Sequence, residues 1–493
     1  MFIQAKKAAV LGFILAGIVI VASGASAGAD GERRYRASWE SLDSHPVPEW
    51  YQDAKFGIFI HWGVYSVPAY HEWYVTFMSP EARFAENLGG PPYYARRGNL
   101  KESVFKRNTS SRGMKPHAYL HHRQDWGADF AYDEFIPMFT AEKFRPERWA
   151  DLFEDAGARY VVLTAKHGDE FALWPSDETP RNAGDTGPRR DLCGDLAGAV
   201  RKKGLRMGLY HNTTYSFWDP RYPRKGWVEY MNRSIRELID RYEPSILWGD
   251  VRTGPARDRD GEPLGADHWN SKHLLAYFYN NSQNPDEVVA NDRWGVDSRG
   301  NHHGDYATPE RRVIESARDE KWETCDSLDP NSWGYRRFTE PDEYKTANEV
   351  VDLLVDVVSK NGNLLLNIGP KPDGTIPDIM RDRLRAVGQW LDVNGEAIYG
   401  TRPWKTYKEG SVRFTAKEHA VYAICLEWPD DTLTLRHVGS GSQGGGRPIA
   451  RVSLLGGEGT LDWSRNAKGL TIQVPAERPC RHAYAFKLEF EAQ

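Results

Sequence analysis

The stretch AKFGIFIHWGVYSVPAYHEWY, residues 54–74, begins as an apolar run and ends among ionisable and aromatic side chains. The run from Phe56 to Ile60 leads directly into His61, and Glu72 and Trp73 follow closely. A short continuous apolar run is typical of a strand that is buried on both faces. Ionisable groups placed directly after such a strand indicate a site at its end.

The same pattern recurs along the chain, with short apolar runs that each follow a charged helical stretch. The predicted strands are 160–164, 207–210, 245–248 and 288–290, and the predicted helices include 146–156, 195–203 and 230–242. This alternation predicts a parallel sheet covered by helices. His61, His167, Asp250 and Arg293 fall at the carboxyl ends of predicted strands. This placement favours a (β/α)8-type barrel, because barrel enzymes build their sites on that face.

The pattern changes near Trp404. Residues 377–396 carry a last long helical period, whereas 420–428, 432–437 and 470–474 are short and alternate between apolar and polar residues. These segments predict a C-terminal antiparallel β-sandwich. We therefore expect three parts, a signal peptide at 1–27, a catalytic barrel at 28–403 and a β-sandwich at 404–493.

The N-terminus has the features of a secretory signal. Lys6 and Lys7 precede an apolar run at 8–22, and residues 25–27 read ASA, a form that signal peptidases prefer. We expect an exported protein, periplasmic or extracellular, with no membrane contact after cleavage. An uncleaved anchor helix is the alternative, although the apolar run is short for a membrane span.

Composition narrows the classes of function. The net charge of -5 and the pI near 6.3 exclude a general nucleic-acid binder, which carries a basic surface. The 18 Trp and 24 Tyr suit sugar recognition, although such rings also fill cores. Cys193, Cys325, Cys425 and Cys480 form no C-x-x-C pair and no zinc spacing, so they are free thiols or at most two disulfides, with Cys425 and Cys480 as one candidate pair.

One carboxylate has the placement of a nucleophile. Asp250 ends the apolar strand SILWGD. A carboxylate there can attack the anomeric carbon of a sugar if a second carboxyl group protonates the leaving oxygen, whereas the alternative role is a helix N-cap. Glu310 in YATPERR and Glu323 in KWETC are both candidates for that partner, and their spacing does not choose between them.

Six blocks together resemble the successive signatures of glycoside hydrolase family 29, the α-L-fucosidases. They are KFGIFIHWGVYSVPAYHEWY, YVVLTAKHGDEFALWPS, ILWGD, NDRWG, KWETCDSLDPNSWGY and NGNLLLNIGPKPDGTIP, in the order of the family. The resemblance implies a (β/α)8-type barrel with a C-terminal β-sandwich. It also implies exo-acting release of terminal α-L-fucose with retention of configuration, without cofactor or metal.

Residue by residue, the resemblance implies that Asp250 is the nucleophile and that Glu310, in a Thr-x-Glu context, is the acid/base. Glu323 is the alternative acid/base. The implied substrate-binding set comprises His61, Glu72, Trp73, His167, Tyr210, Trp248, Arg293 and Trp333.

Two departures from the family pattern affect the substrate. Residues 166–171 read KHGDEF, so Gly168 stands where the family has a second histidine. A lost buried hydrogen bond costs on the order of 1–3 kcal/mol, unless Asp169 or Glu170 fills the space or the sugar is substituted. The second departure is a basic segment between Met78 and Phe130, read as a solvated loop or as an outer subsite for an anionic glycan such as a sulfated fucan. Its basic residues are Arg96, Arg97, Lys101, Lys106, Arg107, Arg112, Lys115 and Arg123.

The expected partner is an oligosaccharide or polysaccharide with terminal fucose, neutral or anionic, and the oligomeric state is left open. Three alternatives stand beside the fucosidase. They are a related glycosidase acting on a substituted fucose or a galactoside, a catalytically silent glycan-binding homologue, and an adhesion protein whose C-terminal domain binds polysaccharide.

Overall fold

The computed structural model describes residues 34–78, 118, 121–127, 129–212, 224–251, 264–301, 303–441 and 447–491. The predicted signal peptide and, apart from Arg123, the basic residues of the segment after Met78 lie outside these ranges. Within them, no helix has the length and apolar character that crossing a membrane requires.

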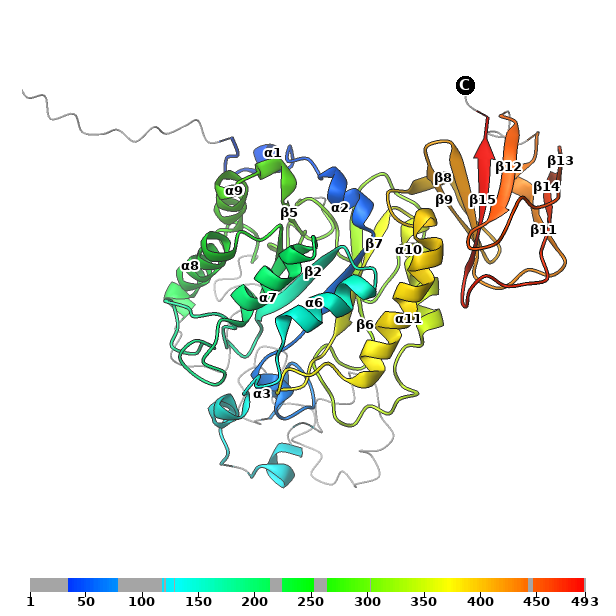
Figure 1. Ribbon diagram of the computed structural model, residues 1–493. Coiled ribbons are helices and arrows are strands. Elements are labelled where there is room, and N and C mark those ends of the chain that lie inside the picture. The colour runs from blue at the N-terminus through cyan, green and yellow to red at the C-terminus, as the bar shows by residue number, and fades with distance from the viewer. Residues whose placement is uncertain are drawn as a thin grey trace, which may run out of the picture. The chain divides into compact units, whose positions relative to one another are not determined.

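Seven parallel strands form the larger sheet, in the order β5-β4-β3-β2-β1-β7-β6 (Figure 1). Their bounds are β1 Phe56–Ile60, β2 Tyr160–Lys166, β3 Arg206–Asn212, β4 Ile246–Asp250, β5 Val289–Ala290, β6 Trp322–Ser327 and β7 Gly362–Ile368. Strands that are neighbours in sequence are mostly neighbours in space, as in a barrel that winds around once.

A short segment joins the two edge strands of this sheet. Tyr306 forms a parallel bridge with Asn291, next to β5, and Ala307 forms one with Trp322 at the start of β6. Glu310 is bridged in the same way to Cys325. Residues 306–310 therefore take the place of an eighth strand, and the predicted (β/α)8-type architecture is confirmed.

Helices lie outside the parallel strands (Figure 1). The long ones are α6 Pro146–Asp155, α7 Leu192–Lys202, α8 Arg224–Tyr242, α9 Ser271–Asn281, α10 Ala347–Ser359 and α11 Asp378–Asn394. The short ones are α1 Trp39–Leu42, α2 Glu49–Ala54 and α3 Tyr74–Phe77. Local sequence fixes several starts: α6 has proline in its first turn, and Thr346 and Glu349 form a capping box at α10.

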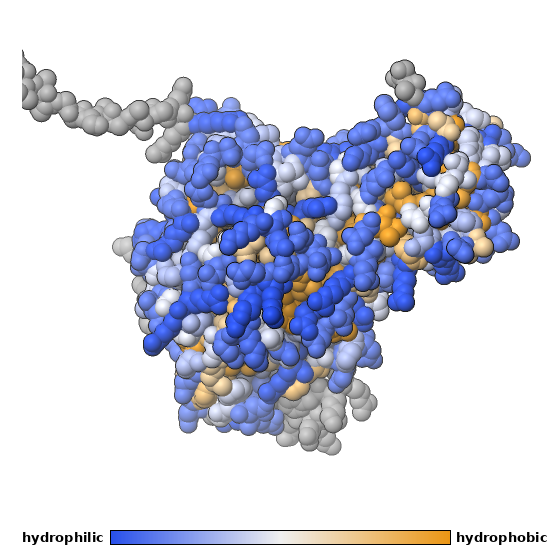
Figure 2. All heavy atoms as spheres, viewed as in Figure 1, coloured by the Kyte–Doolittle hydropathy of each residue, from blue (hydrophilic) through white to orange (hydrophobic). Residues whose placement is uncertain are grey.

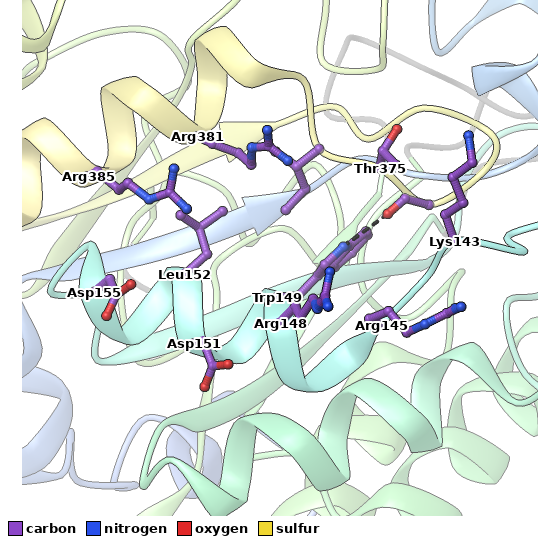
Figure 3. Close-up of a pocket in the computed structure, with 12 residues that line it drawn as sticks. Lys143, Arg145, Arg148, Trp149, Asp151, Leu152, Asp155, Thr375, Arg381 and Arg385 are labelled. Carbon is purple, nitrogen blue, oxygen red and sulfur yellow. Dashed lines mark hydrogen bonds between the residues drawn. The ribbon is translucent and has the colours of Figure 1, made fainter.

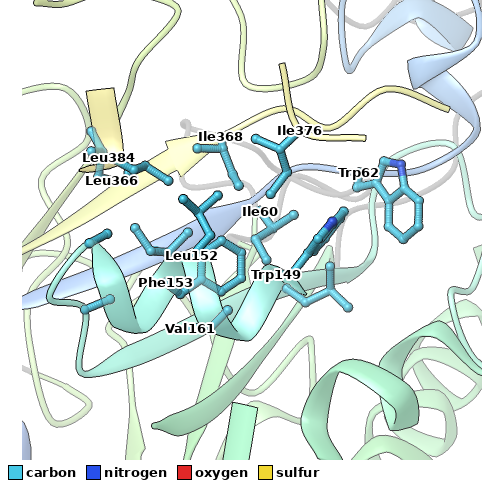
Figure 4. Packing of buried hydrophobic residues seen from close by; sticks show 14 of the residues in the cluster. Ile60, Trp62, Trp149, Leu152, Phe153, Val161, Leu366, Ile368, Ile376 and Leu384 are labelled. Carbon is cyan, nitrogen blue, oxygen red and sulfur yellow. The ribbon is translucent and has the colours of Figure 1, made fainter. Parts of the chain in front are cut away.

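Alternate side chains of each strand pack on opposite faces of the sheet. On the outside, Ile60 and Val161 contact the apolar face of α6, including Leu152 and Phe153 (Figure 4). On the inside, a second cluster fills the barrel with rings and branched side chains, among them Phe59, Tyr160, Val162, Trp248 and Leu365. Burial on both faces explains why these strands are continuously apolar.

The C-terminal strands form two antiparallel sheets that share one apolar cluster, as predicted for a β-sandwich. The first has the order β12-β15-β10-β9-β8 and the second β11-β14-β13. Their bounds are β8 Arg402–Glu409, β9 Val412–Lys417, β10 Ala420–Cys425, β11 Thr432–Leu435, β12 Ile449–Leu454, β13 Trp463–Asn466, β14 Gly469–Gln473 and β15 Tyr484–Phe490.

The four cysteines are free thiols. Cys425 lies in the apolar cluster of the C-terminal sheets, and the thiol of Cys480 donates to the carbonyl oxygen of Ala483 at 3.6 Å. The alternative of a bond between Cys425 and Cys480 is therefore wrong for this structure.

The surface in view is mainly hydrophilic, with small separate hydrophobic patches (Figure 2). Among the described residues, the large hydrophobic side chains that are exposed are Met138 and Phe338. Most of the described aromatic residues therefore pack inside the protein or around its site.

Candidate active site

The carboxyl ends of the parallel strands bring the predicted site residues together. His61 directly follows β1, His167 directly follows β2, and Tyr210 lies near the end of β3. Asp250 is the last residue of β4, and Arg293 comes shortly after β5. The placement of these groups at strand ends, expected from the sequence, is confirmed.

Arg293 contacts two of the predicted carboxyl groups with one nitrogen. Its Nη1 donates to Oδ1 of Asp250 at 3.0 Å and to Oε2 of Glu310 at 3.2 Å. The two oxygens therefore lie no further apart than the sum of these distances, about 6 Å. Retaining glycosidases hold their carboxyl groups about 5–5.5 Å apart, and inverting enzymes hold them further apart.

Both of these carboxyl groups are open to solvent. The side chain of Asp250 is 27% exposed and that of Glu310 is 37% exposed. The hydroxyl group of Tyr210 donates to Oδ2 of Asp250 at 2.9 Å. Burial and the charge of Asp250 raise the pKa of Tyr210 well above its usual value, so this phenol stays a donor. Each oxygen of Asp250 thus accepts one hydrogen bond.

Arg293 itself is buried, and other groups hold it. Its Nε donates to Oγ1 of Thr308 at 2.9 Å, and its Nη2 donates to the carbonyl oxygen of Thr308 at 3.2 Å. The guanidinium lies over the ring of Trp248, 4.6 Å from the centroid. Burial acts to lower the pKa of Arg293, but the nearby carboxylates outweigh it and raise the pKa, so the group is a cation.

Glu323 lies in a different environment, inside the barrel. It is fully buried, and its carboxylate accepts hydrogen bonds from Tyr160 at 2.6 Å, from Tyr51 at 2.9 Å and from Nε1 of Trp248 at 3.0 Å. Trp248 is also buried, between this carboxylate and Arg293. Neither side chain faces solvent.

Two neutral histidines line the same face. Nδ1 of His61 lies 2.7 Å from Oδ1 of Asn367, whose amide nitrogen donates to the carbonyl oxygen of Trp333, so His61 carries its proton on Nδ1. Burial lowers the pKa of His61 to about 3 and that of His167 to about 4. Nδ1 of His167 is buried without a hydrogen-bond partner. These imidazoles therefore present uncharged ring nitrogens at neutral pH.

Glu72 holds the loop that carries Trp333. Its Oε2 accepts from Oγ of Ser332 at 2.9 Å and from the backbone N–H groups of Trp333 at 3.0 Å and Gly334 at 3.4 Å. Burial acts to raise the pKa of Glu72, but the surrounding imidazoles and hydrogen bonds lower it to about 2. The ring of Trp333, fixed in this way, stacks on His61 with centroids 5.2 Å apart.

Trp73 occupies the space beside Gly168. A Cβ atom on Gly168 would lie 2.4 Å from Cζ3 of the Trp73 indole, which also contacts His167 with ring centroids 4.7 Å apart. Asp169 instead accepts a hydrogen bond from Tyr132, and Glu170 forms a buried ion pair with Lys166. The expectation that Asp169 or Glu170 fills this space is wrong, because both are bound elsewhere.

Sequence reasoning missed several groups of the site. Asn367 orients His61, Ser332 bonds Glu72, and Thr308 and Asp292 hold Arg293. Asn367 and Asp292 follow the same rule as the predicted residues, since each lies at or just after the carboxyl end of a strand. That rule would have found them.

Across the described ranges, no group of three or more His, Cys, Asp and Glu side chains is arranged to hold a metal ion.

Two further cavities have linings that include neither Asp250 nor Glu310. One, of about 330 Å³, runs between α6 and α11, and its basic residues include Arg148, Arg381 and Arg385 (Figure 3). The other, of about 460 Å³, borders the segment that completes the barrel, beside Ala307 and Trp322. Its lining also includes Asp292 and Thr308, so this cavity lies next to the groups that hold Arg293.

Comparison with protein families gives two matches. Residues 23–396 match the family described as Alpha-L-fucosidase, and residues 406–489 match the Alpha-L-fucosidase C-terminal domain. Among curated proteins, human tissue alpha-L-fucosidase is 40% identical over 477 residues, which cover 92% of each chain. The rat tissue alpha-L-fucosidase is 38% identical over 479 residues, covering 94% of this chain and 93% of the relative.

Solved structures give the same result. The crystal structure of Thermotoga maritima alpha-fucosidase is similar with a TM-score of 0.70 and 36% identity, covering 92% of this chain and all of that chain. The same enzyme in complex with fucose has a TM-score of 0.70 and 35% identity, with the same coverage. An alpha-L-fucosidase isoenzyme from Paenibacillus thiaminolyticus is 25% identical, with a TM-score of 0.69, and covers 90% of this chain and 98% of that one.

Proposed function

Because this chain belongs to the α-L-fucosidase family, we propose that it releases terminal α-L-fucose with Asp250 as the nucleophile and Glu310 as the acid/base. The family resemblance read from the sequence is confirmed, and the chain is a fucose-releasing glycosidase. The observation that carries the residue assignment is the contact of both carboxyl groups with one nitrogen of Arg293. This contact supports the assignment, because an upper limit of about 6 Å between the two oxygens is compatible with the separation that a double displacement uses.

In the first step, an oxygen of Asp250 attacks the anomeric carbon of fucose. The bond from that carbon to the glycosidic oxygen breaks, and Glu310 gives its proton to the departing oxygen. Tyr210 and Arg293 each bond one oxygen of Asp250, so the carboxylate is oriented before the substrate arrives. The product of this step is a fucosyl ester of Asp250.

In the second step, the carboxylate of Glu310 takes a proton from water. The water oxygen bonds to the anomeric carbon, and the ester bond to Asp250 breaks. Two inversions restore the original configuration. Arg293 remains a cation throughout and stabilises whichever carboxylate is ionised.

Glu310 suits the acid/base role better than Glu323. A general acid must reach the glycosidic oxygen directly or through one water. Glu323 is fully buried and bound to Tyr51, Tyr160 and Trp248, whereas the side chain of Glu310 is 37% exposed. A sugar bound at Asp250 can therefore reach the carboxyl group of Glu310, whereas Glu323 is enclosed by other side chains.

The fucose ring would contact both polar and aromatic side chains. The uncharged nitrogens of His61 and His167 suit hydrogen bonds with its hydroxyl groups. The indoles of Trp73 and Trp333 supply apolar faces for its C–H groups and methyl group. Glu72 contributes by holding the loop that carries Trp333, and Trp248 contributes by packing against the guanidinium of Arg293.

The test compares Asp250→Gly with Glu310→Ala in the presence of azide, with aryl α-L-fucosides as substrates. Asp250→Gly should lose at least about 10³-fold in kcat, and azide should enter its vacated face to give β-L-fucosyl azide. Glu310→Ala should still react with substrates that have good leaving groups, and azide should then give the α anomer. An α-fucosyl azide formed by Glu323→Ala, with Glu310→Ala unaffected, would reverse the assignment.

We also propose, from the sequence, that the enzyme is exported and that it acts on anionic glycans. The leader at 1–27 supports an exported enzyme, and the basic residues between Arg96 and Arg123 support glycans with sulfate or carboxylate groups. Raising the salt concentration should increase KM for a sulfated fucoside and leave KM for the neutral one unchanged. Equal KM values for the sulfated substrate at low and high salt would count against the anionic class.

A further inference from the structure

We propose that Thr308 and Asp292 are positioning residues that keep Arg293 in contact with both carboxyl groups at once. This inference rests on the proposed roles of Asp250 and Glu310. It adds two residues that do not touch the substrate and act only through the guanidinium.

The contacts form a chain of buried hydrogen bonds. Oγ1 of Thr308 accepts from Nε of Arg293 at 2.9 Å and donates its own proton to Oδ1 of Asp292 at 2.5 Å. The same Oδ1 accepts from the backbone N–H of Thr308 at 3.0 Å, and Gly300 donates to the other oxygen at 3.2 Å. Asp292, Arg293 and Thr308 are each at most 3% exposed.

These hydrogen bonds leave the Thr308 hydroxyl group only the role of acceptor toward Arg293. A hydroxyl group has one proton, and Asp292 takes it, so the Thr308 oxygen can only accept from Nε of Arg293. The Thr308 carbonyl accepts from Nη2 as well. Nη2 also donates to Sγ of Cys325 at 3.8 Å, so Nε and Nη2 are both occupied and Nη1 is the nitrogen that remains for Asp250 and Glu310.

The positioning matters because the guanidinium lies between competing acceptors. A free arginine forms a bidentate pair with one carboxylate. Such a pair with Asp250 would release Glu310, and a shift of the reacting groups by about 1 Å can cost about 10²-fold in rate. The contacts of Nε and Nη2 with Thr308, together with that of Nη2 with Cys325, oppose this because they occupy the donors that a second carboxylate oxygen would use.

Asp292 also adds a negative charge behind Arg293. The other ionisable groups whose charges act on this region come from several strands and loops. They are Tyr210, Asp250, Arg299, Tyr306, Glu310, Glu323 and Cys325. Loss of the Asp292 charge would leave the positive charge of Arg293 less balanced and would weaken the acceptor that orients the Thr308 hydroxyl group.

The first test replaces the hydroxyl group of Thr308. Thr308→Val keeps the shape of the side chain and removes both hydrogen bonds, so kcat/KM on an aryl α-L-fucoside should fall by about 10²-fold. The fall should be mainly in kcat, since no contact with the sugar is lost. Thr308→Ser keeps the hydroxyl group and should recover most of the activity.

The second test uses charge. Asp292→Asn can still accept from Thr308 but is neutral, so the hydrogen bond is weaker and kcat should fall severalfold while KM stays near the wild-type value. A residue with a purely structural role would lower stability and leave kcat of the folded variant unchanged. Thermal melts of each variant show that the kinetics are measured on folded protein.

The outcomes separate this inference from the proposed function. Wild-type kinetics for Thr308→Val or for Asp292→Asn would overturn the positioning role. Equal losses in Thr308→Val and Thr308→Ser would also overturn it. Full activity of Asp250→Gly would instead refute the catalytic assignment itself, whatever the Thr308 variants do.

Discussion

The indole of Trp73 leaves room only for glycine at position 168. An added Cβ would lie 2.4 Å from the ring, so Gly168→Ala should push Trp73 from its place beside His167. We expect KM for an aryl α-L-fucoside to rise about tenfold, which corresponds to about 1.4 kcal/mol of lost binding. Steady-state kinetics at several substrate concentrations measure this change.

Gly198 provides the matched control for that substitution. An added Cβ at Gly198 meets nothing within 4 Å, so Gly198→Ala should leave KM unchanged. Combining Gly168→Ala with Trp73→Phe, which shortens the ring, should give a smaller loss than the two single effects predict. A KM for Gly168→Ala equal to that of the wild type would mean that the indole has no fixed role there.

Individual site residues could be predicted where they end or directly follow a strand that has a clear apolar pattern. Asp250 and His167 end or follow apolar runs, so their position needed only the pattern of the chain. Asp292 follows β5, so the same rule could have placed it at the site, but its role toward Arg293 could not be predicted because it acts through Thr308. Thr308 lies in no strand, so neither its place nor its role has a signal in its own stretch of sequence.

At the scale of elements, β6 contributes a buried carboxylate to the interior of the barrel. Glu323→Ala would leave the donors of Tyr51, Tyr160 and Trp248 without an acceptor. At about 1–3 kcal/mol for each unsatisfied group, the free energy of unfolding should fall by roughly 3 kcal/mol or more. Urea unfolding measures it, with Glu310→Ala, on the open face, as the control of near-normal stability. Equal stability of the two variants would place Glu323 outside the supporting structure.

Elements with strong patterns were predicted well, and the closing segment was not. The strands 160–164 and 207–210 and the helix 146–156 were predicted close to their observed bounds because burial imposes continuous apolar runs. Residues 306–310 read YATPE and pair only through isolated bridges. So short a segment has no periodicity of its own, and only its neighbours β5 and β6 show that it completes the barrel.

At the scale of the whole molecule, Lys55 makes stability depend on pH. Burial and the charge of Arg402 lower the pKa of Lys55 to about 7. The unfolded chain binds this proton below about pH 10.5 while the folded protein does not, so stability falls as the pH drops from there to about 7, by roughly 1.4 kcal/mol per pH unit at most. Below that range both states are protonated and the difference is constant.

Lys55→Met should remove the contribution of Lys55 to the pH dependence of stability. The variant should be more stable than the wild type at pH 7, and the difference should shrink as the pH approaches 9.5. Urea unfolding of both proteins at the two pH values measures it, with Lys202→Met, an exposed lysine of α7, as the control. If the difference in unfolding free energy between Lys55→Met and the wild type did not change with pH, the Lys55 amine could not be buried and uncharged as described.

The central claim, that Asp250 forms a covalent fucosyl ester, has one direct measurement. A 2-deoxy-2-fluoro fucosyl fluoride should react with the wild-type protein and then turn over slowly, because the 2-fluorine slows both steps while the good fluoride leaving group keeps the first step fast. Peptide mass spectrometry of the trapped protein should find the sugar on Asp250. A label on Glu310 or Glu323, or rapid release of an inverted product without any label, would contradict the account.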